Sequence, residues 1–92
     1  MELKTKDEII ARFNSFNENS KPNAVYCRIH WDGNPEDETD EELVALFPTI
    51  GEDCDDEVVY SCYGGMSEFL ELMDDNNGSD FKVVAVLGFC RI

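Results

Sequence analysis

The sequence FKVVAVLGFC, residues 81–90, decides the fold class, because apolar residues occupy both sides of its alternating pattern. The two sides are Phe81, Val83, Ala85, Leu87 and Phe89 against Val84, Val86 and Cys90. A strand that is apolar on both faces is typical of a covered position within a sheet. The run therefore predicts a β-strand in the middle of a sheet.

Two further segments, Ala24–Trp31 and Val58–Tyr63, have the alternation of strands that are buried on one face. In the first segment Cys27 lies on the apolar side and His30 on the opposite side. Half-exposed strands favour antiparallel neighbours, so we expect an antiparallel or mixed sheet of three strands.

A helix is predicted before each of the three strands. The segment Thr5-Lys-Asp-Glu8 fits a capping box, which predicts a helix from about Lys6 to Phe16 or Asn17. A second capping box, Thr39-Asp-Glu-Glu42, predicts a short helix within Glu36–Phe47, and Pro48 stops it.

Ser67 is placed to N-cap a third helix, whose buried side would carry Phe69, Leu70, Leu72 and Met73. The predicted order is α-β-α-β-α-β, which is an α+β fold with about three helices packed on one sheet. Residues 32–57 and 64–80 are long enough to contain crossover helices. The 92 residues are expected to form a single domain, 1–92.

The charge distribution is the main functional signal in the sequence. Residues 32–80 contain 17 Asp or Glu residues and no Lys or Arg, and the whole chain has a net charge of −14. Ordinary soluble domains intersperse both signs on their surface. A one-sign surface repels nucleic acid and anionic membranes and attracts basic protein surfaces. We therefore expect a basic protein partner, with no direct binding of nucleic acid or membrane.

The predicted contact surface combines acids from a helix start, from the loop Glu52–Glu57 and from a helix face. Such an array can mimic duplex DNA, which carries about one negative charge per 1.7 Å of its axis. The predicted partner-binding residues are Asp32, Glu36, Asp37, Glu38, Asp40, Glu41, Glu52, Asp53, Asp55, Asp56, Glu57, Glu71, Asp74 and Asp75.

No metal or cofactor site is predicted. An EF-hand loop needs an oxygen ligand five residues before its glycine. Counting back from Gly33, Gly64, Gly65 or Gly78 reaches Arg28, Val59, Tyr60 or Met73, none of which is a ligand for Ca²⁺. Zinc sites need closely spaced Cys and His, but there is no C-x-x-C and His30 is the only histidine.

The chain is not expected to be an enzyme. A cysteine nucleophile would need a histidine base, and strand alternation separates Cys27 from His30. Cys62 or Cys90 on a neighbouring strand stays open as a partner for His30. No pair stands out among the 21 acids for acid–base chemistry.

The composition favours a cytosolic location. No segment approaches the roughly 20 apolar residues of a membrane span, and the N-terminus lacks the apolar core of a signal peptide. Cys27, Cys54, Cys62 and Cys90 are then expected as reduced thiols, at least three of them in strand-like runs.

In size, acidity and α+β build, the chain resembles phage-encoded anti-CRISPR proteins. The resemblance rests locally on three segments. They are the strand and turn Val25-Tyr-Cys-Arg-Ile-His-Trp-Asp-Gly33 and the acidic runs Glu36–Glu42 and Glu52–Glu57. The resemblance implies a stoichiometric protein inhibitor whose acids meet Lys and Arg in the DNA-binding or guide-binding groove of a CRISPR effector complex.

Three alternatives stay open. An acidic immunity protein or antitoxin would block the basic active site of a nuclease by the same electrostatics. An acidic domain without a polyanion-mimic role would carry its charge for solubility. An enzyme or metal-binding module would differ from the anti-CRISPR and immunity-protein alternatives in depending little on salt.

Overall fold

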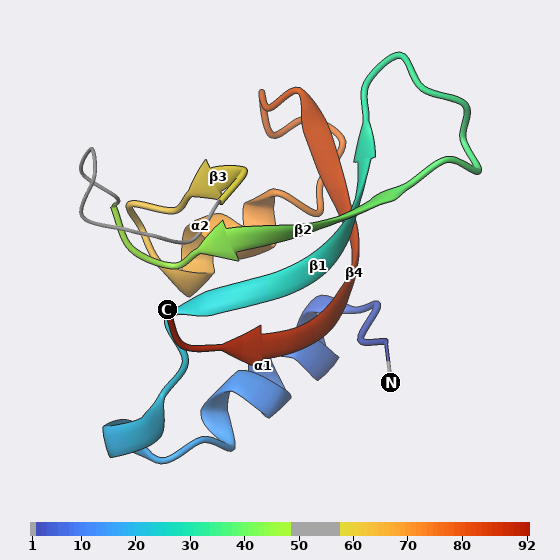
Figure 1. Cartoon of the computed structure of the whole chain (residues 1–92). Coiled ribbons are helices and arrows are strands. Elements are labelled where there is room, and N and C mark those ends of the chain that lie inside the picture. The colour runs from blue at the N-terminus through green and yellow to red at the C-terminus, as the bar shows by residue number, and fades with distance from the viewer. Residues whose placement is uncertain (1, 49–57) are drawn as a thin grey trace.

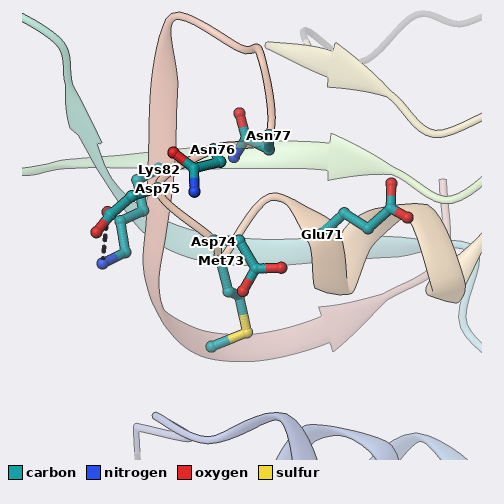
Figure 2. A pocket seen from close by; sticks show the side chains of 7 residues that line it. All are labelled: Glu71, Met73, Asp74, Asp75, Asn76, Asn77 and Lys82. Atoms are coloured by element: carbon teal, nitrogen blue, oxygen red, sulfur yellow. Dashed lines mark ion pairs between the residues drawn. The ribbon is translucent and has the colours of Figure 1, made fainter.

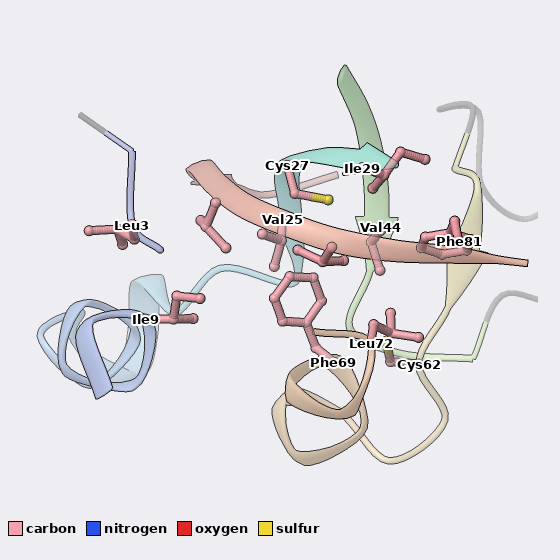
Figure 3. Close-up of a cluster of buried hydrophobic side chains, with 12 residues drawn as sticks. Leu3, Ile9, Val25, Cys27, Ile29, Val44, Cys62, Phe69, Leu72 and Phe81 are labelled. Atoms are coloured by element: carbon pink, nitrogen blue, oxygen red, sulfur yellow. The ribbon is translucent and has the colours of Figure 1, made fainter. Parts of the chain in front are cut away.

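The computed structural model describes residues 2–48 and 58–92, which form a four-stranded mixed sheet with two α-helices on one face (Figures 1 and 3). The strand order is β3-β2-β1-β4, with β1 antiparallel to β2 and β4, and β2 parallel to β3. The elements are α1 (Lys6–Asn14), a 3₁₀ turn η1 (Glu18–Ser20), β1 (Ala24–Trp31), β2 (Asp40–Ala45), β3 (Tyr60–Ser61), α2 (Met66–Glu71) and β4 (Phe81–Cys90). The α+β class is confirmed, and of the two kinds of sheet expected the mixed one is found. The predicted three strands and three helices are wrong.

The first helix begins where its capping box predicts. The Glu8 N–H donates to the Thr5 hydroxyl oxygen at 3.2 Å, and the Thr5 N–H donates to the Glu8 carboxylate at 3.2 Å. These bonds satisfy two backbone donors that a helix start leaves open. The α-helix ends at Asn14, shortly before the predicted end.

Strand β1 is the centre of the sheet, and its alternation is confirmed. Val25, Cys27 and Ile29 are fully buried on the helix-covered face, whereas Tyr26 is 42% exposed on the other face. The core therefore lies on one side of the sheet.

The helix predicted within Glu36–Phe47 is wrong, because this segment contains strand β2. Its residues pair antiparallel with β1, with Val44 facing Val25, and Val44 is fully buried. Pairing with β1 satisfies the backbone groups along one edge of the central strand, which a helix could not do. Local helix signals are weak against such tertiary pairing. Thr39, the predicted helix cap, instead has its hydroxyl 3.5 Å from Arg28 Nη1.

The segment after the undescribed residues also differs from its prediction. Strand β3 is limited to Tyr60–Ser61 and runs parallel to β2. Helix α2 is N-capped by Gly65, at φ 68°, and not by Ser67. The Gly64 N–H donates to the Glu68 carboxylate at 3.2 Å, so a side chain within the helix covers a donor just before its start.

Strand β4 lies at an edge of the sheet, so its predicted central position is wrong. Its outer flank is nevertheless covered at two points. Leu3 and Val86 exchange backbone hydrogen bonds at 2.9 and 2.8 Å, and the Val83 N–H donates to the Leu72 carbonyl at 2.8 Å. These bonds occupy backbone donors and acceptors that an edge strand otherwise leaves unpaired.

Strand β4 also bulges twice against β1. The register passes from Ala85 to Val83 without Val84, and from Gly88 to Val86 without Leu87. Bulges increase twist and bend a strand, as the curvature of β4 in Figure 1 shows.

Side chains from both helices meet the inner face of the sheet in one core (Figure 3). Ile9 of α1 and Phe69 of α2 are fully buried there, and Leu72 directly after α2 is 2% exposed. Phe69, Leu70, Leu72 and Met73, the predicted buried side of the last helix, all belong to this core, with Leu70 and Met73 partly buried. Only Phe69 and Leu70 are helical, because α2 ends at Glu71.

Candidate functional site

Two acidic connections meet at the end of the sheet where β1 finishes and β4 begins (Figure 1). The β1–β2 connection covers residues 32–39, and the α2–β4 connection covers residues 72–80. The Asp32 N–H donates to the Asp80 carbonyl oxygen at 2.9 Å, which joins them. We name their carboxylates the acidic end: Asp32, Glu36, Asp37, Glu38, Asp74, Asp75 and Asp80.

The β1–β2 connection is held by His30 and by consecutive turns. His30 Nε2 lies 3.1 Å from both the Asn34 and the Pro35 carbonyl oxygens, so this nitrogen is the N–H donor. The Asn34 N–H donates to the Trp31 carbonyl at 3.2 Å, and the Glu38 N–H donates to the Pro35 carbonyl at 2.9 Å. His30 is thus a half-buried support for the acids beside it.

The acidic side chains of this connection face solvent and have no basic partner in the described part of the chain. Asp32, Glu36, Asp37 and Glu38 are exposed, and so are Asp40 and Glu41 at the start of β2. None of these six takes part in an ion pair among residues 2–48 and 58–92. Six of the predicted contact residues therefore present uncompensated carboxylates.

A broad hollow lies along the α2–β4 connection (Figure 2). Its volume is about 760 Å³, and Glu71, Asp74 and Asp75 of the predicted set line it together with Met73, Asn76, Asn77 and Lys82. Two of these carboxylates are paired with the chain's own lysines: Asp74 with Lys6 at 2.9 Å, and Asp75 with Lys82 at 3.0 Å. This side of the acidic end is therefore less negative than its acid content indicates.

The turn before β4 fixes where Asp80 lies. The Ser79 N–H donates to Asn77 Oδ1 at 2.6 Å, and Gly78 adopts φ 81°, a conformation that glycine reaches without strain. Asn77 Nδ2 is buried without a hydrogen-bond partner in the described structure, which typically costs about 1–3 kcal/mol. One end of the Asn77 amide therefore holds the turn, while its unpaired Nδ2 lowers the stability of the fold.

A smaller hollow connects the two acidic groups. It has a volume of about 380 Å³ and is lined by Glu36 and Asp75 together with His30, Lys82 and Val84. Glu36 and Asp75 are far apart in the sequence but border the same depression. The structure thus brings together predicted residues from both connections.

Three features of this region were not predicted. Asp80 joins the acidic end, Lys82 partly neutralises it, and an aromatic pocket beside it contains Trp31, Tyr60 and Phe81. Trp31 faces Phe81 because β1 and β4 pair there. The alternation of each strand indicates an apolar side, but no signal in the sequence specifies which strands pair.

Five of the predicted contact residues lie outside the described residues: Glu52, Asp53, Asp55, Asp56 and Glu57. The loop prediction for Glu52–Glu57 and the thiol prediction for Cys54 fall there as well. The described part of the predicted surface is therefore the β1–β2 connection with the start of β2, together with the end of α2.

The buried cysteines are poor nucleophiles. Burial raises the pKa of Cys27 and of Cys62 to about 12, so both are thiols at neutral pH. Within residues 2–48 and 58–92, Cys27 and Cys62 form no disulfide bond. Because His30 Nε2 contacts two backbone carbonyl oxygens, that ring nitrogen supports the β1–β2 connection.

In the described part of the chain, no group of three or more His, Cys, Asp or Glu side chains is arranged to hold a metal ion. The helices of this part are too short or too polar to cross a membrane. The chain matches no protein-family model, no curated protein and no solved structure.

Proposed function

We propose that the protein binds a basic surface of a nucleic-acid-binding protein through the acidic end and thereby blocks that surface. The observation that carries this proposal is the 2.9 Å hydrogen bond from Asp32 to Asp80, which places two acidic connections at the same end of the sheet. Acids that are separated in the sequence can thus act on one partner.

Charge gives this surface its physical advantage. A net charge of −14 attracts a basic partner over about a Debye length, which raises the association rate and makes it sensitive to salt. The uncompensated carboxylates of the β1–β2 connection would then meet Lys and Arg side chains that otherwise bind phosphates. In this proposal the protein acts as a stoichiometric inhibitor, without chemistry of its own.

For the partner class, we propose a CRISPR effector complex, with the acids bound in its DNA-binding or guide-binding groove. The support for this step is the resemblance to anti-CRISPR proteins in size, acidity and α+β build. A nuclease inhibited by an immunity protein or antitoxin would use the same electrostatics and is distinguished by the identity of the captured partner.

The test is capture of effector complexes from a bacterial lysate at about 0.1 M and about 0.5 M salt, with and without competing DNA. Capture at low salt that DNA competes and high salt removes would support the proposal. Capture of a nuclease instead would favour the immunity-protein alternative. No nucleic-acid-binding partner at either salt would contradict the proposal.

A matched pair of variants locates the contact. Glu36→Lys with Asp37→Lys changes the net charge by four within the acidic end. Asn14→Lys, Asn17→Lys and Glu18→Lys together make the same change at exposed positions near the end of α1 and in η1. We expect the first variant to lose capture and the control to keep most of it. Equal loss in both would mean that only net charge matters.

A further inference from the structure

A small aromatic pocket adjoins the acidic end. Its volume is about 340 Å³, and it lies where the end of β1 and the start of β4 meet β3. The residues that line it are Trp31, Val59, Tyr60, Asn77, Gly78, Ser79, Asp80 and Phe81. The Asp32–Asp80 hydrogen bond closes the sheet end beside it, so the pocket and the acids share one support.

Three rings give the pocket its apolar lining. The Phe81 ring centroid lies 5.3 Å from that of Trp31 and 5.8 Å from that of Tyr60, with interplanar angles of 58° and 75°. Phe81 is only 4% exposed, whereas Trp31 and Tyr60 are half-buried, so most of the open ring surface belongs to the latter two. Rings set at steep angles around a hollow offer both faces and edges to a bound group.

The electrostatics of the pocket favour a cation. Asp80 is among the residues that line it, and no Lys or Arg is. The nearby Lys82 is paired with Asp75. Ring faces carry partial negative charge and attract ammonium and guanidinium groups, most strongly at Trp. Burial, followed by the neighbouring Glu68 carboxylate, raises the pKa of Tyr60, so this side chain stays a neutral phenol at physiological pH.

We propose that this pocket binds an organic cation, namely the ammonium or guanidinium group of a Lys or Arg side chain on the basic partner. Trp31 and Tyr60 would contact the cation and its aliphatic stem, and Asp80 would supply the opposite charge. The inference deepens the proposed function and rests on it for the identity of the partner. It assigns the interface an anchor, since binding energy concentrates where a side chain fills a desolvated pocket and not along a charged rim.

Cation binding can be measured without the partner, because Trp31 is the only tryptophan of the chain. The full chain is titrated with N-acetyl-arginine methylamide, N-acetyl-lysine methylamide and the trimethyl-lysine analogue, with the citrulline and norleucine amides as neutral controls. Trp31 fluorescence and the amide NMR shifts of residues 79–81 are followed. We expect saturable changes with the cations at millimolar concentration. The cation that binds most tightly identifies whether the partner supplies a Lys or an Arg side chain. No change in either signal, or equal binding of the neutral compounds, would overturn the proposal.

Variants test the roles of the lining residues. Tyr60→Leu and Asp80→Asn should each weaken cation binding by roughly three- to tenfold, whereas Tyr60→Phe keeps the ring and should bind nearly as the unmodified chain does. Tyr63→Leu is the matched control, because Tyr63 is 75% exposed and does not line the pocket. A Tyr63 variant that weakened binding as much as the Tyr60 variant would contradict the assignment.

The two proposals fail in different ways. If Tyr60→Leu binds no cation but still captures the partner at full strength, the pocket is not an anchor and the charge proposal stands. If cations bind but no nucleic-acid-binding protein is captured, the assignment of the pocket as a cation site stands and the proposed function is wrong.

Discussion

Lys82 and Asp75 form an ion pair with Nζ and Oδ1 3.0 Å apart, inside the most acidic region of the protein. Lys82 faces His30 across β1 and β4, so it lies on the open face of the sheet and borders the hollow that joins the two acidic connections. The pair neutralises one carboxylate of the acidic end. Both side chains are exposed, Lys82 to 42% and Asp75 to 80%. Exposed pairs of this kind are weak and can be exchanged for a partner's cation.

Replacing Lys82 by Met should therefore strengthen partner capture without unfolding the protein. The change frees Asp75, and the free energy of unfolding should shift by less than about 1 kcal/mol, as is usual for exposed pairs. Urea unfolding and capture at about 0.5 M salt measure the two effects. Lys21→Met, at the other end of the molecule, removes the same charge and is the control. Equal capture by the two variants would contradict a specific role for Asp75.

Removing the His30 side chain should loosen the β1–β2 connection. In His30→Ala, the Asn34 and Glu38 amides should exchange with solvent roughly three- to tenfold faster, because a neutral hydrogen bond contributes about 0.5–1.5 kcal/mol. His30→Gln retains an N–H donor, so we expect a smaller increase. The Ser20 amide, which donates to the Asn17 carbonyl in η1, is the internal reference. Unchanged exchange at Asn34 and Glu38 would show that the turns are stable without the His30 side chain.

Stability should fall in alkaline solution because of the buried thiols. The pKa of Cys27 and Cys62 is about 12 in the folded chain, against an ordinary value of 9.0. Between these values the unfolded chain binds fewer protons, so the free energy of unfolding decreases as pH rises. The decrease is at most about 1.4 kcal/mol per pH unit for each thiol. Below about pH 9 both states keep the thiols protonated, so the stability linked to them is fully present there.

Urea unfolding at several pH values between about 8 and 11 tests this window. A Cys54→Ser, Cys90→Ser background leaves only the two buried thiols. Adding Cys27→Ala and Cys62→Ala should flatten the decline, whatever their effect at neutral pH. Identical slopes with and without the two thiols would assign the alkaline loss to other groups.

Salt should stabilise the folded chain. A compact body of net charge −14 suffers self-repulsion, which added salt screens. We expect the melting temperature to rise between about 0.05 M and 0.5 M KCl. The rise should be smaller in a variant with Glu36→Gln, Asp37→Asn and Glu38→Gln, which removes three uncompensated charges from the acidic end. An equal rise in both proteins would mean that this connection contributes little to the repulsion.

Local signals in the sequence predicted α1 and β1 well. Thr5 and Glu8 are adjacent to the helix they cap, and the alternation of β1 depends only on which face is covered. The same local reasoning failed for Thr39-Asp-Glu-Glu42, because the last three residues of this equally good capping box begin strand β2. Its partner is β1, and the hydrogen bonds gained there do not appear in a local pattern.

The candidate site was predicted in its charge but not in its arrangement. The exposed acids of the β1–β2 connection follow from composition, whereas their proximity to Asp75 and Asp80 depends on the pairing of β1 with β4. The lysine partners of Asp74 and Asp75 come from α1 and β4, outside the basic-free segment. The charge pattern therefore indicated the surface, and only the fold shows which of its carboxylates are compensated.

The place of β1 between β2 and β4 also constrains when the protein can fold during synthesis. Ala24 pairs with Cys90, and Trp31 pairs with Phe81, so β1 lacks one neighbour until residues 81–90 have left the ribosome. Until then Val25, Cys27 and Ile29 have no complete core to enter. Pairing between segments so distant along the chain is slow, because loop closure precedes any gain from contact. The nascent chain therefore remains exposed to chaperones and proteases until its last strand is made.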